Sequence, residues 1–188
     1  MIVHFNSKQP AFTLLELLVV ISIMAILTGI LLPSLSKMRE TAMKTVCASN
    51  LRQIGIAIEA YVQENQQTYP VARYMPDPFL SIFKDDPGLP DALEHEMPTN
   101  SEVYACPGDD GQVFNRAGTS YTYNASLAGQ TLDKTWFSRW VKFDKPKIPV
   151  AYDCDGNNFL LFGNETITVP PFHTLRNLLF ADGRVGNY

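Results

Sequence analysis

The sequence predicts an α+β fold, in which one long N-terminal helix packs on a small antiparallel β-sheet. Three observations support this prediction. An apolar run from Phe12 to Leu32 continues in helical phase beyond Pro33. Prolines then interrupt the chain from Pro70 to Pro90, and short β-type runs follow Asn100. A helix followed by a series of strands is the element order of an α+β domain.

Composition narrows the class of protein further. The 188 residues are 46% hydrophobic and 18% charged, which is typical of a globular chain with room for one core. The formal net charge is -4, whereas proteins that bind nucleic acids usually present a basic surface. We therefore expect no nucleic-acid partner.

The apolar run is long enough to cross a membrane, since about 20 helical residues span the bilayer core. A short polar leader precedes it. We accordingly divide the chain into a leader (1–11), a transmembrane or assembly helix with Pro33 at its end (12–33), an amphipathic continuation of the helix (34–67) and a globular α+β domain (68–188).

Three other interpretations of the apolar run compete: a signal peptide cut near Ser34-Leu35-Ser36, a plain single-pass anchor, and a buried core helix. The apolar positions keep their helical phase beyond Pro33, which argues against removal because a discarded peptide has no need to match its cargo. These positions are Leu35, Met38, Ala42, Val46, Leu51, Ile54, Ile58 and Tyr61.

Glu16 is the unusual residue of the apolar run, because an ionised carboxylate in a membrane helix costs about 2.5 to 3.5 kcal/mol on insertion scales. Such a charge requires a partner. If the chain were cut before Phe12, the new α-amino group would lie one helical turn before Glu16 with the opposite charge. A carboxylate in the first turn also complements the helix dipole.

The run Ala11-Phe12-Thr13-Leu14-Leu15-Glu16-Leu17 resembles the prepilin peptidase site of type IV pilins and type II secretion pseudopilins. The resemblance implies cleavage between Ala11 and Phe12, N-methylation of Phe12, and pairing of Glu16 with the N-terminal amine of a neighbouring subunit. It also implies that Pro33 bends the helix, as a proline inside a helix does. The family usually has glycine where this chain has Ala11.

The same resemblance implies a pilin-like fold and a function without catalysis: a structural subunit of a type IV pilus or a type II secretion pseudopilus. Its location would be the bacterial inner membrane, as a single-pass protein with the C-terminal domain outside the cytoplasm, and then a periplasmic or surface filament. Its partners would be prepilin peptidase, a secretion or pilus assembly platform, and copies of itself or other pilins.

A second resemblance covers the rest of the chain. The segment Cys47 to Gly55, the pairs Tyr69-Pro70 and Cys106-Pro107, and His173 with Asp182-Gly183 resemble pseudopilin-like proteins that are abundant in planctomycetes. Those proteins have nine residues between the histidine and Asp-Gly. The spacer here, 174–181, is one residue shorter.

The predicted strands follow Asn100 and alternate with turn residues. Asp182-Gly183 between the last two apolar runs predicts a hairpin. The runs are Glu102 to Tyr104, Ser120 to Tyr123, Val150 to Tyr152, Phe159 to Phe162, Thr166 to Val169, Asn177 to Phe180, and Arg184-Val185.

Oxygen ligands cluster around Gly156, where Asp153, Asp155 and Asn157 form a candidate calcium site, because Ca²⁺ takes six to eight oxygens. The resemblance to secretion pseudopilins supports this interpretation, because the major type of that family binds calcium near its C-terminal loops. The alternative is an Asx-rich turn without a metal.

The three cysteines are too few for a disulfide scaffold. Pairing of Cys106 with Cys154 and pairing of Cys47 with Cys106 are both feasible, and three unpaired thiols are the alternative.

A second candidate function is a membrane-anchored extracytoplasmic binding module. Trp136, Phe137 and Trp140 lie near Arg139 and Lys142, a combination that can stack on carbohydrate or DNA, although aromatic core residues on a strand have the same pattern. A third candidate is an anchored hydrolase. No nucleophile motif accompanies His173 and Asp182, so we expect no enzymatic activity and interpret Asp182 as a turn residue.

Overall fold

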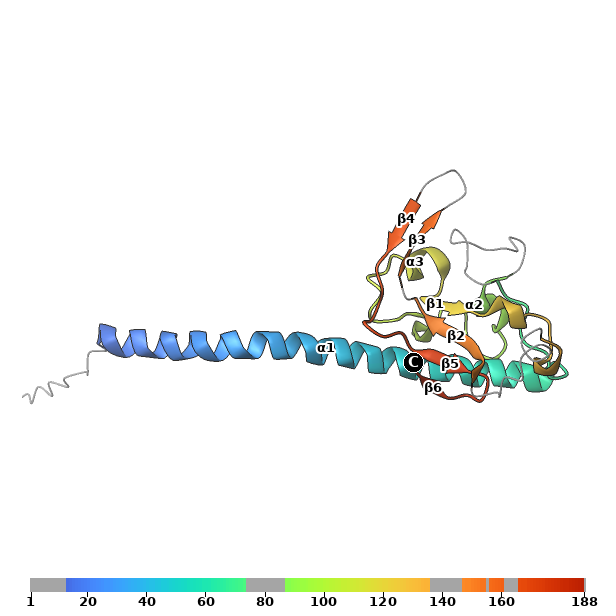
Figure 1. The fold of residues 1–188 in the computed structure, drawn as a ribbon, viewed down its shortest axis with the longest axis horizontal. Helices are drawn as coiled ribbons and strands as arrows, with labels where there is room; N and C mark the ends of the chain where they lie inside the picture. Colours follow the sequence, from blue (N-terminus) through green and yellow to red (C-terminus); the bar gives the residue numbers. More distant parts are fainter. Residues whose placement is uncertain (1–12, 74–86, 136–146, 155, 161–165, 188) are drawn as a thin grey trace, which may run out of the picture. The chain divides into compact units, whose positions relative to one another are not determined.

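The computed structural model describes residues 13–73, 87–135, 147–154, 156–160 and 166–187. It divides into two compact units, 1–39 and 40–188. A single helix, α1 (Leu14–Glu64), begins in the first unit and ends in the second (Figure 1). The described elements of both units are α-helical and antiparallel β, so the predicted α+β class is confirmed.

Beyond α1, the described residues of the second unit form short helices and six strands. The helical segments are α2 (Leu89–Ala92), η1 (Glu102–Tyr104), α3 (Phe114–Ala117), η2 (Ala125–Leu127) and η3 (Leu132–Lys134). The strands are β1 (Tyr121–Tyr123), β2 (Pro149–Asp153), β3 (Asn157–Leu160), β4 (Thr166–Val169), β5 (Leu178–Phe180) and β6 (Val185–Gly186).

Four of the strands form one antiparallel sheet in the order β1-β2-β5-β6, and β3 pairs with β4 in a separate two-stranded sheet. In the larger sheet Tyr121 lies opposite Asp153, and Leu179 lies opposite both Ala151 on β2 and Val185 on β6. The register shifts between Pro149 and Ala151. β2 pairs with β5 on both sides of this shift, and Asp153, a residue of the candidate site, lies at the end of β2.

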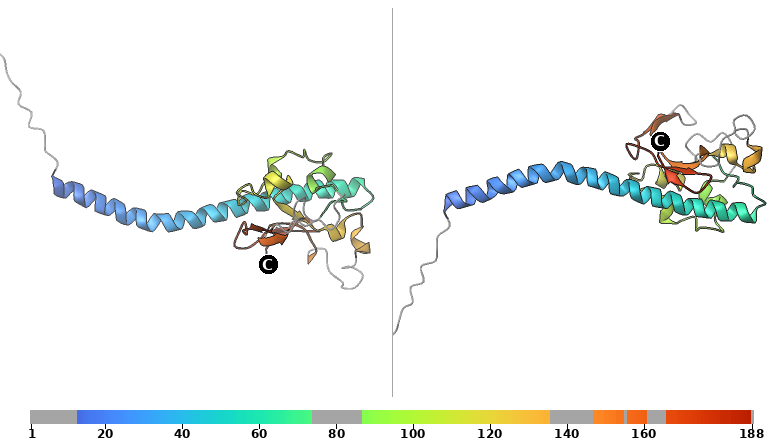
Figure 2. Two further views of the ribbon diagram at one scale, coloured as in Figure 1. Left: turned by 90° about the horizontal axis from the view of Figure 1, so that it is seen from above. Right: turned by 60° about the horizontal axis from the view of Figure 1, so that its bottom comes forward.

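The second part of α1 forms the base of the core, and Figure 2 shows it beside β5 and β6. Its buried residues recur at helical spacing: Cys47, Asn50, Leu51, Ile54, Ala57, Ile58 and Val62. The predicted apolar face is therefore confirmed from Leu51 onward. Its earlier members Leu35, Met38 and Val46 are exposed.

Gly55 permits the close approach of helix and sheet. A Cβ atom built at this position would lie 2.7 Å from Cδ1 of Leu179 on β5. Gly29, in contrast, has no described neighbour within 4 Å of such an atom. Close packing thus explains Gly55, although it does not explain Gly29.

The predicted strand at Glu102 to Tyr104 is wrong, because this segment is the 3-10 helix η1. The hydroxyl of Ser101 accepts a hydrogen bond from the backbone N–H of Val103, and the Ser101 carbonyl accepts one from Tyr104. Serine turns of this kind compete with strand pairing and override the β-propensity of Val103 and Tyr104.

The predicted hairpin at Asp182-Gly183 is confirmed, since β5 pairs with β6 across it. Gly183 adopts a φ of 79°, in the left-handed region that favours glycine. A carboxylate oxygen of Asp182 accepts a hydrogen bond from the backbone N–H of Arg184. Asp182 therefore acts as the turn residue that the sequence indicates.

Candidate functional site

The N-terminus of α1 is closed by two side chains, Thr13 and Glu16. Oε2 of Glu16 accepts hydrogen bonds from the backbone N–H and the hydroxyl of Thr13, at 2.9 and 2.8 Å. The Thr13 hydroxyl oxygen in turn accepts the backbone N–H of Glu16 at 3.2 Å. This reciprocal arrangement is a capping box, which satisfies amide groups that a helix start leaves without partners. Sequence analysis assigned Glu16 a charge partner and missed this local role, although Thr-x-x-Glu is its signature.

The first unit exposes an apolar surface. Large hydrophobic side chains from Leu14 to Leu32 are 43 to 87% exposed. Within the described residues, α1 is the one helix long and apolar enough to cross a membrane, by length and composition. Pro33 lies inside this helix and has no N–H to donate to the preceding turn. Ala11 and Phe12, the predicted cleavage residues, lie outside the described residues.

These features define the class: a protein with a capped, apolar, membrane-spanning N-terminal helix and a small α+β domain. Residues 6–32 match a family model described as the prokaryotic N-terminal methylation motif. The match supports a type IV pilin-like N-terminal segment, as the sequence predicts. No curated protein and no solved structure matches the chain. The resemblance to planctomycete proteins stays a prediction.

A second cluster of reactive side chains lies in the core of the 40–188 unit, where four segments meet. Cys47 on α1 forms a disulfide with Cys106, which follows η1. His173 lies between β4 and β5, and its Nε2 atom is 3.2 Å from Sγ of Cys106 and 3.8 Å from Oδ2 of Asp153 at the end of β2. All four residues are buried.

The carboxylate of Asp153 is held by Asn177. Oδ1 accepts the backbone N–H of Asn177 at 2.8 Å, and Oδ2 accepts its side-chain amide at 2.9 Å. Burial raises the pKa of Asp153 to about 6, although the bonds from Asn177 oppose this shift. Burial also lowers the pKa of His173, and the positive charge of Lys44 acts in the same direction. Both shifts favour uncharged side chains in the core.

The structure selects one of the two cysteine pairings that the sequence left open. Cys47 is bonded to Cys106, so pairing of Cys106 with Cys154 does not occur, and Cys154 is buried outside this disulfide. Helical phase places Cys47 on the buried face of α1. Asn50, one turn later on the same face, donates its side-chain amide to the carbonyl of Ala105 at 2.9 Å. The two contacts together fix the 105–106 segment on the helix.

The predicted calcium ligands are only partly described. Asp153 points into the core toward Asn177 and His173, Asp155 lies outside the described residues, and only the backbone of Asn157, in β3, is described. Gly156 has a φ of 75° and lies against Pro171, where a Cβ would clash with the backbone. Calcium binding at these three residues stays a prediction. The aromatic segment 136–142 also lies outside the described residues.

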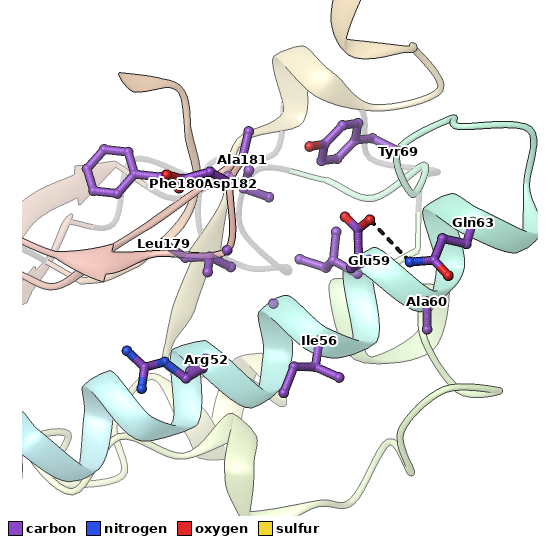
Figure 3. Close-up of a pocket in the computed structure, with 14 residues that line it drawn as sticks. Arg52, Ile56, Glu59, Ala60, Gln63, Tyr69, Leu179, Phe180, Ala181 and Asp182 are labelled. Carbon is purple, nitrogen blue, oxygen red and sulfur yellow. Dashed lines mark hydrogen bonds between the residues drawn. The ribbon is translucent and has the colours of Figure 1, made fainter. Parts of the chain in front are cut away.

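An open groove runs between α1 and the β5-β6 hairpin (Figure 3). Ile56 and Leu179 supply apolar surface, and Arg52 lies at one end. Near the other end, the amide of Gln63 donates to the carboxylate of Glu59 at 3.3 Å. Sequence reasoning did not indicate this groove, because it depends on how residues about 120 positions apart pack together.

Proposed function

We propose that this chain is a structural subunit of a type IV pilus or a type II secretion pseudopilus. It is made as a prepilin, cleaved between Ala11 and Phe12, N-methylated at Phe12 and polymerised through its N-terminal helix. The observation that carries this proposal is the exposed apolar helix with Glu16 in its first turn, inside a match to the N-terminal methylation motif.

The exposure of the apolar residues supports two successive environments for the helix. At about 25 cal/mol per Å² of buried apolar area, leaving this surface in water would be strongly unfavourable. A bilayer covers it before assembly, and the helices of neighbouring subunits cover it in a filament. The amphipathic continuation of the helix (34–67) connects the apolar segment to the globular domain, because the buried face of this continuation belongs to the domain core.

The hydrogen bonds of Glu16 support a role between subunits. Within the described residues, Oε2 accepts both bonds from Thr13, and Oε1 accepts none. Oε1 is therefore available to the cleaved amine of Phe12 on an adjacent subunit, with the capping box intact. In a low-dielectric environment such an ion pair offsets the cost of the buried charge.

The disulfide supports an extracytoplasmic location for the globular domain. Disulfides persist in the periplasm and at the cell surface, whereas cytosolic proteins keep their thiols reduced. Cys47 and Cys106 are both in the 40–188 unit. We infer a single-pass orientation with this unit outside the cytoplasm, and the partners are prepilin peptidase, an assembly platform and other pilin subunits.

Substitution of Glu16 separates its two roles. Glu16→Gln keeps a side chain that can close a capping box but removes the charge, whereas Glu16→Ala removes both. We expect both variants to be inserted and cleaved, and both to be absent from sheared or cross-linked filaments. Ser22→Ala, on the same exposed helix, is the matched control and should assemble normally.

Two results would count against the proposal. If Glu16→Gln assembles like the unmodified chain and only Glu16→Ala fails, then Glu16 acts as a helix cap and not as an intersubunit charge. If neither variant affects assembly, the N-terminal helix serves as a plain anchor.

A further inference from the structure

We propose that the reduced chain has a binding site for one thiophilic divalent cation of the zinc type, formed by Cys47, Cys106, His173 and Asp153. The cation and the Cys47–Cys106 disulfide are mutually exclusive occupants of the same place in the core. The proposal concerns the 40–188 unit and is independent of the function proposed above.

Three of the four donor atoms are already gathered. Sγ of Cys47, Sγ of Cys106 and a ring nitrogen of His173 lie within 4.8 Å of one another. Oδ2 of Asp153, the fourth donor, lies 3.8 Å from Nε2 of the same imidazole. Two thiolates, one imidazole and one carboxylate match the number and kind of ligands that tetrahedral Zn²⁺ takes in proteins.

The distances agree with a tetrahedral site once the disulfide is reduced. With Zn–S near 2.3 Å and Zn–N near 2.05 Å, the N···S edge of the tetrahedron is about 3.5 Å. Nε2 of His173 is 3.2 Å from Sγ of Cys106 in the oxidised chain. The remaining adjustment is the separation of the two sulfur atoms on reduction, to the S···S edge of about 3.8 Å.

The surroundings of the cluster are those of a built site. Asp153 is fully buried, His173 is 6% exposed, and the two cysteines are 0 and 2% exposed. Asn177 donates to both carboxylate oxygens of Asp153 and so fixes its orientation, which is the usual arrangement around a metal-binding carboxylate. The backbone N–H of Gly108 points to Sγ of Cys106 at 3.4 Å, a contact that stabilises a thiolate.

Exchange between the two states is a balanced reaction with a disulfide oxidant. The two metal-bound thiolates give two electrons to the oxidant R–S–S–R, forming the Cys47–Cys106 bond and two R–S⁻ thiolates, and the cation leaves. The sulfur atoms of the product no longer carry negative charge, so the oxidised chain lacks two of the four ligands. In the reduced chain the cation thus holds Cys47 and Cys106 together until oxidation joins them in the disulfide.

The test uses the full chain in detergent micelles, reduced under anaerobic conditions and titrated with Co²⁺, which reports tetrahedral thiolate ligation by its visible d–d bands and its sulfur-to-metal charge-transfer band. We expect one equivalent to bind, Zn²⁺ to displace it, and a disulfide oxidant to abolish the bands. The double variant Cys47→Ser with Cys106→Ser should lose the charge-transfer band. His173→Ala and Asp153→Asn should each weaken binding at least about tenfold.

Two variants serve as matched controls. His95→Ala removes an exposed histidine, and Cys154→Ser removes the buried thiol that is not in the cluster, so neither should change Co²⁺ affinity. Near-ultraviolet circular dichroism establishes that each variant is folded. If the reduced chain shows no such bands when Co²⁺ is added, the proposal is overturned, whether or not its near-ultraviolet circular dichroism changes. Binding that depends on Cys154, or that survives in the double cysteine variant, would overturn it as well.

Discussion

The carboxylate of Asp153 receives both hydrogen bonds that Asn177 can give it, one from the backbone at 2.8 Å and one from the side-chain amide at 2.9 Å. The same amide also donates to the carbonyl of Lys44 on α1 at 3.2 Å. Asn177, which directly precedes β5, thereby links β2 to α1. Its hydrogen bonds give partners to polar groups of these two elements.

Asn177→Ala should lower the free energy of unfolding by about 3 kcal/mol, because it removes the side-chain amide that donates to Oδ2 of the buried Asp153 carboxylate and to the Lys44 carbonyl, and leaves only the backbone N–H to Oδ1. Urea unfolding of the oxidised chain in micelles measures this loss. In an Asp153→Ala background the same substitution should cost clearly less, since the two residues are coupled. Strictly additive effects would show that the pair does not act as a unit.

Removal of the disulfide should destabilise the 40–188 unit. Cys47 and Cys106 are separated by 59 positions, for which the chain-entropy estimate is about 4 kcal/mol. The variant Cys47→Ser with Cys106→Ser, measured without metal, should show this loss in urea unfolding. Cys154→Ser is the control, and equal losses in the two proteins would contradict the assigned pairing.

Two buried tyrosines differ in their hydroxyl partners and form a matched pair. The Tyr123 hydroxyl donates to the carbonyl of Pro70 at 3.0 Å, whereas that of Tyr104 has no hydrogen-bond partner among the described residues. Tyr123→Phe should therefore cost about 1 kcal/mol of unfolding free energy, and Tyr104→Phe should be neutral or stabilising. A larger loss at Tyr104 than at Tyr123 would show that the hydroxyl contacts are assigned incorrectly.

Buried tyrosines should also make the domain sensitive to alkali. Burial raises the pKa of Tyr69 to about 12 and that of Tyr123 well above its usual value. The folded state therefore keeps protons that the unfolded state loses, so this stability is present below about pH 10 and disappears as pH rises through the folded-state pKa. Urea unfolding at a series of alkaline pH values should show the decline, and Tyr123→Phe should make it less steep. An unchanged slope in that variant would contradict this explanation.

The features of the N-terminal helix could be predicted from the sequence because their signals are local. Thr13 and Glu16 are three positions apart, and the apolar run to Leu32 is continuous. The Asp182-Gly183 hairpin was equally predictable, since the turn and its strands adjoin. The strand predicted at Tyr104 failed, because the Ser101 turn competes with a weak strand propensity.

The core cluster could not be predicted, because its members are distant in sequence and meet only through the packing of α1 on the sheet. Cys47 and Cys106 were a feasible pair, yet nothing in the spacing favoured them over Cys106 and Cys154. The proximity of His173 to Cys106 depends on the path of the chain between β4 and β5. A long-range contact of this kind has no local sequence signature.

The central claim is that the chain is a processed pilin-like subunit, and intact-mass analysis with N-terminal fragmentation of the chain isolated from membranes tests it most directly. The account predicts that residues 1–11 are absent and that the new N-terminus is a singly methylated Phe12. A mature chain that retains Met1, or one that begins at Lys37 beyond the apolar run, would contradict it.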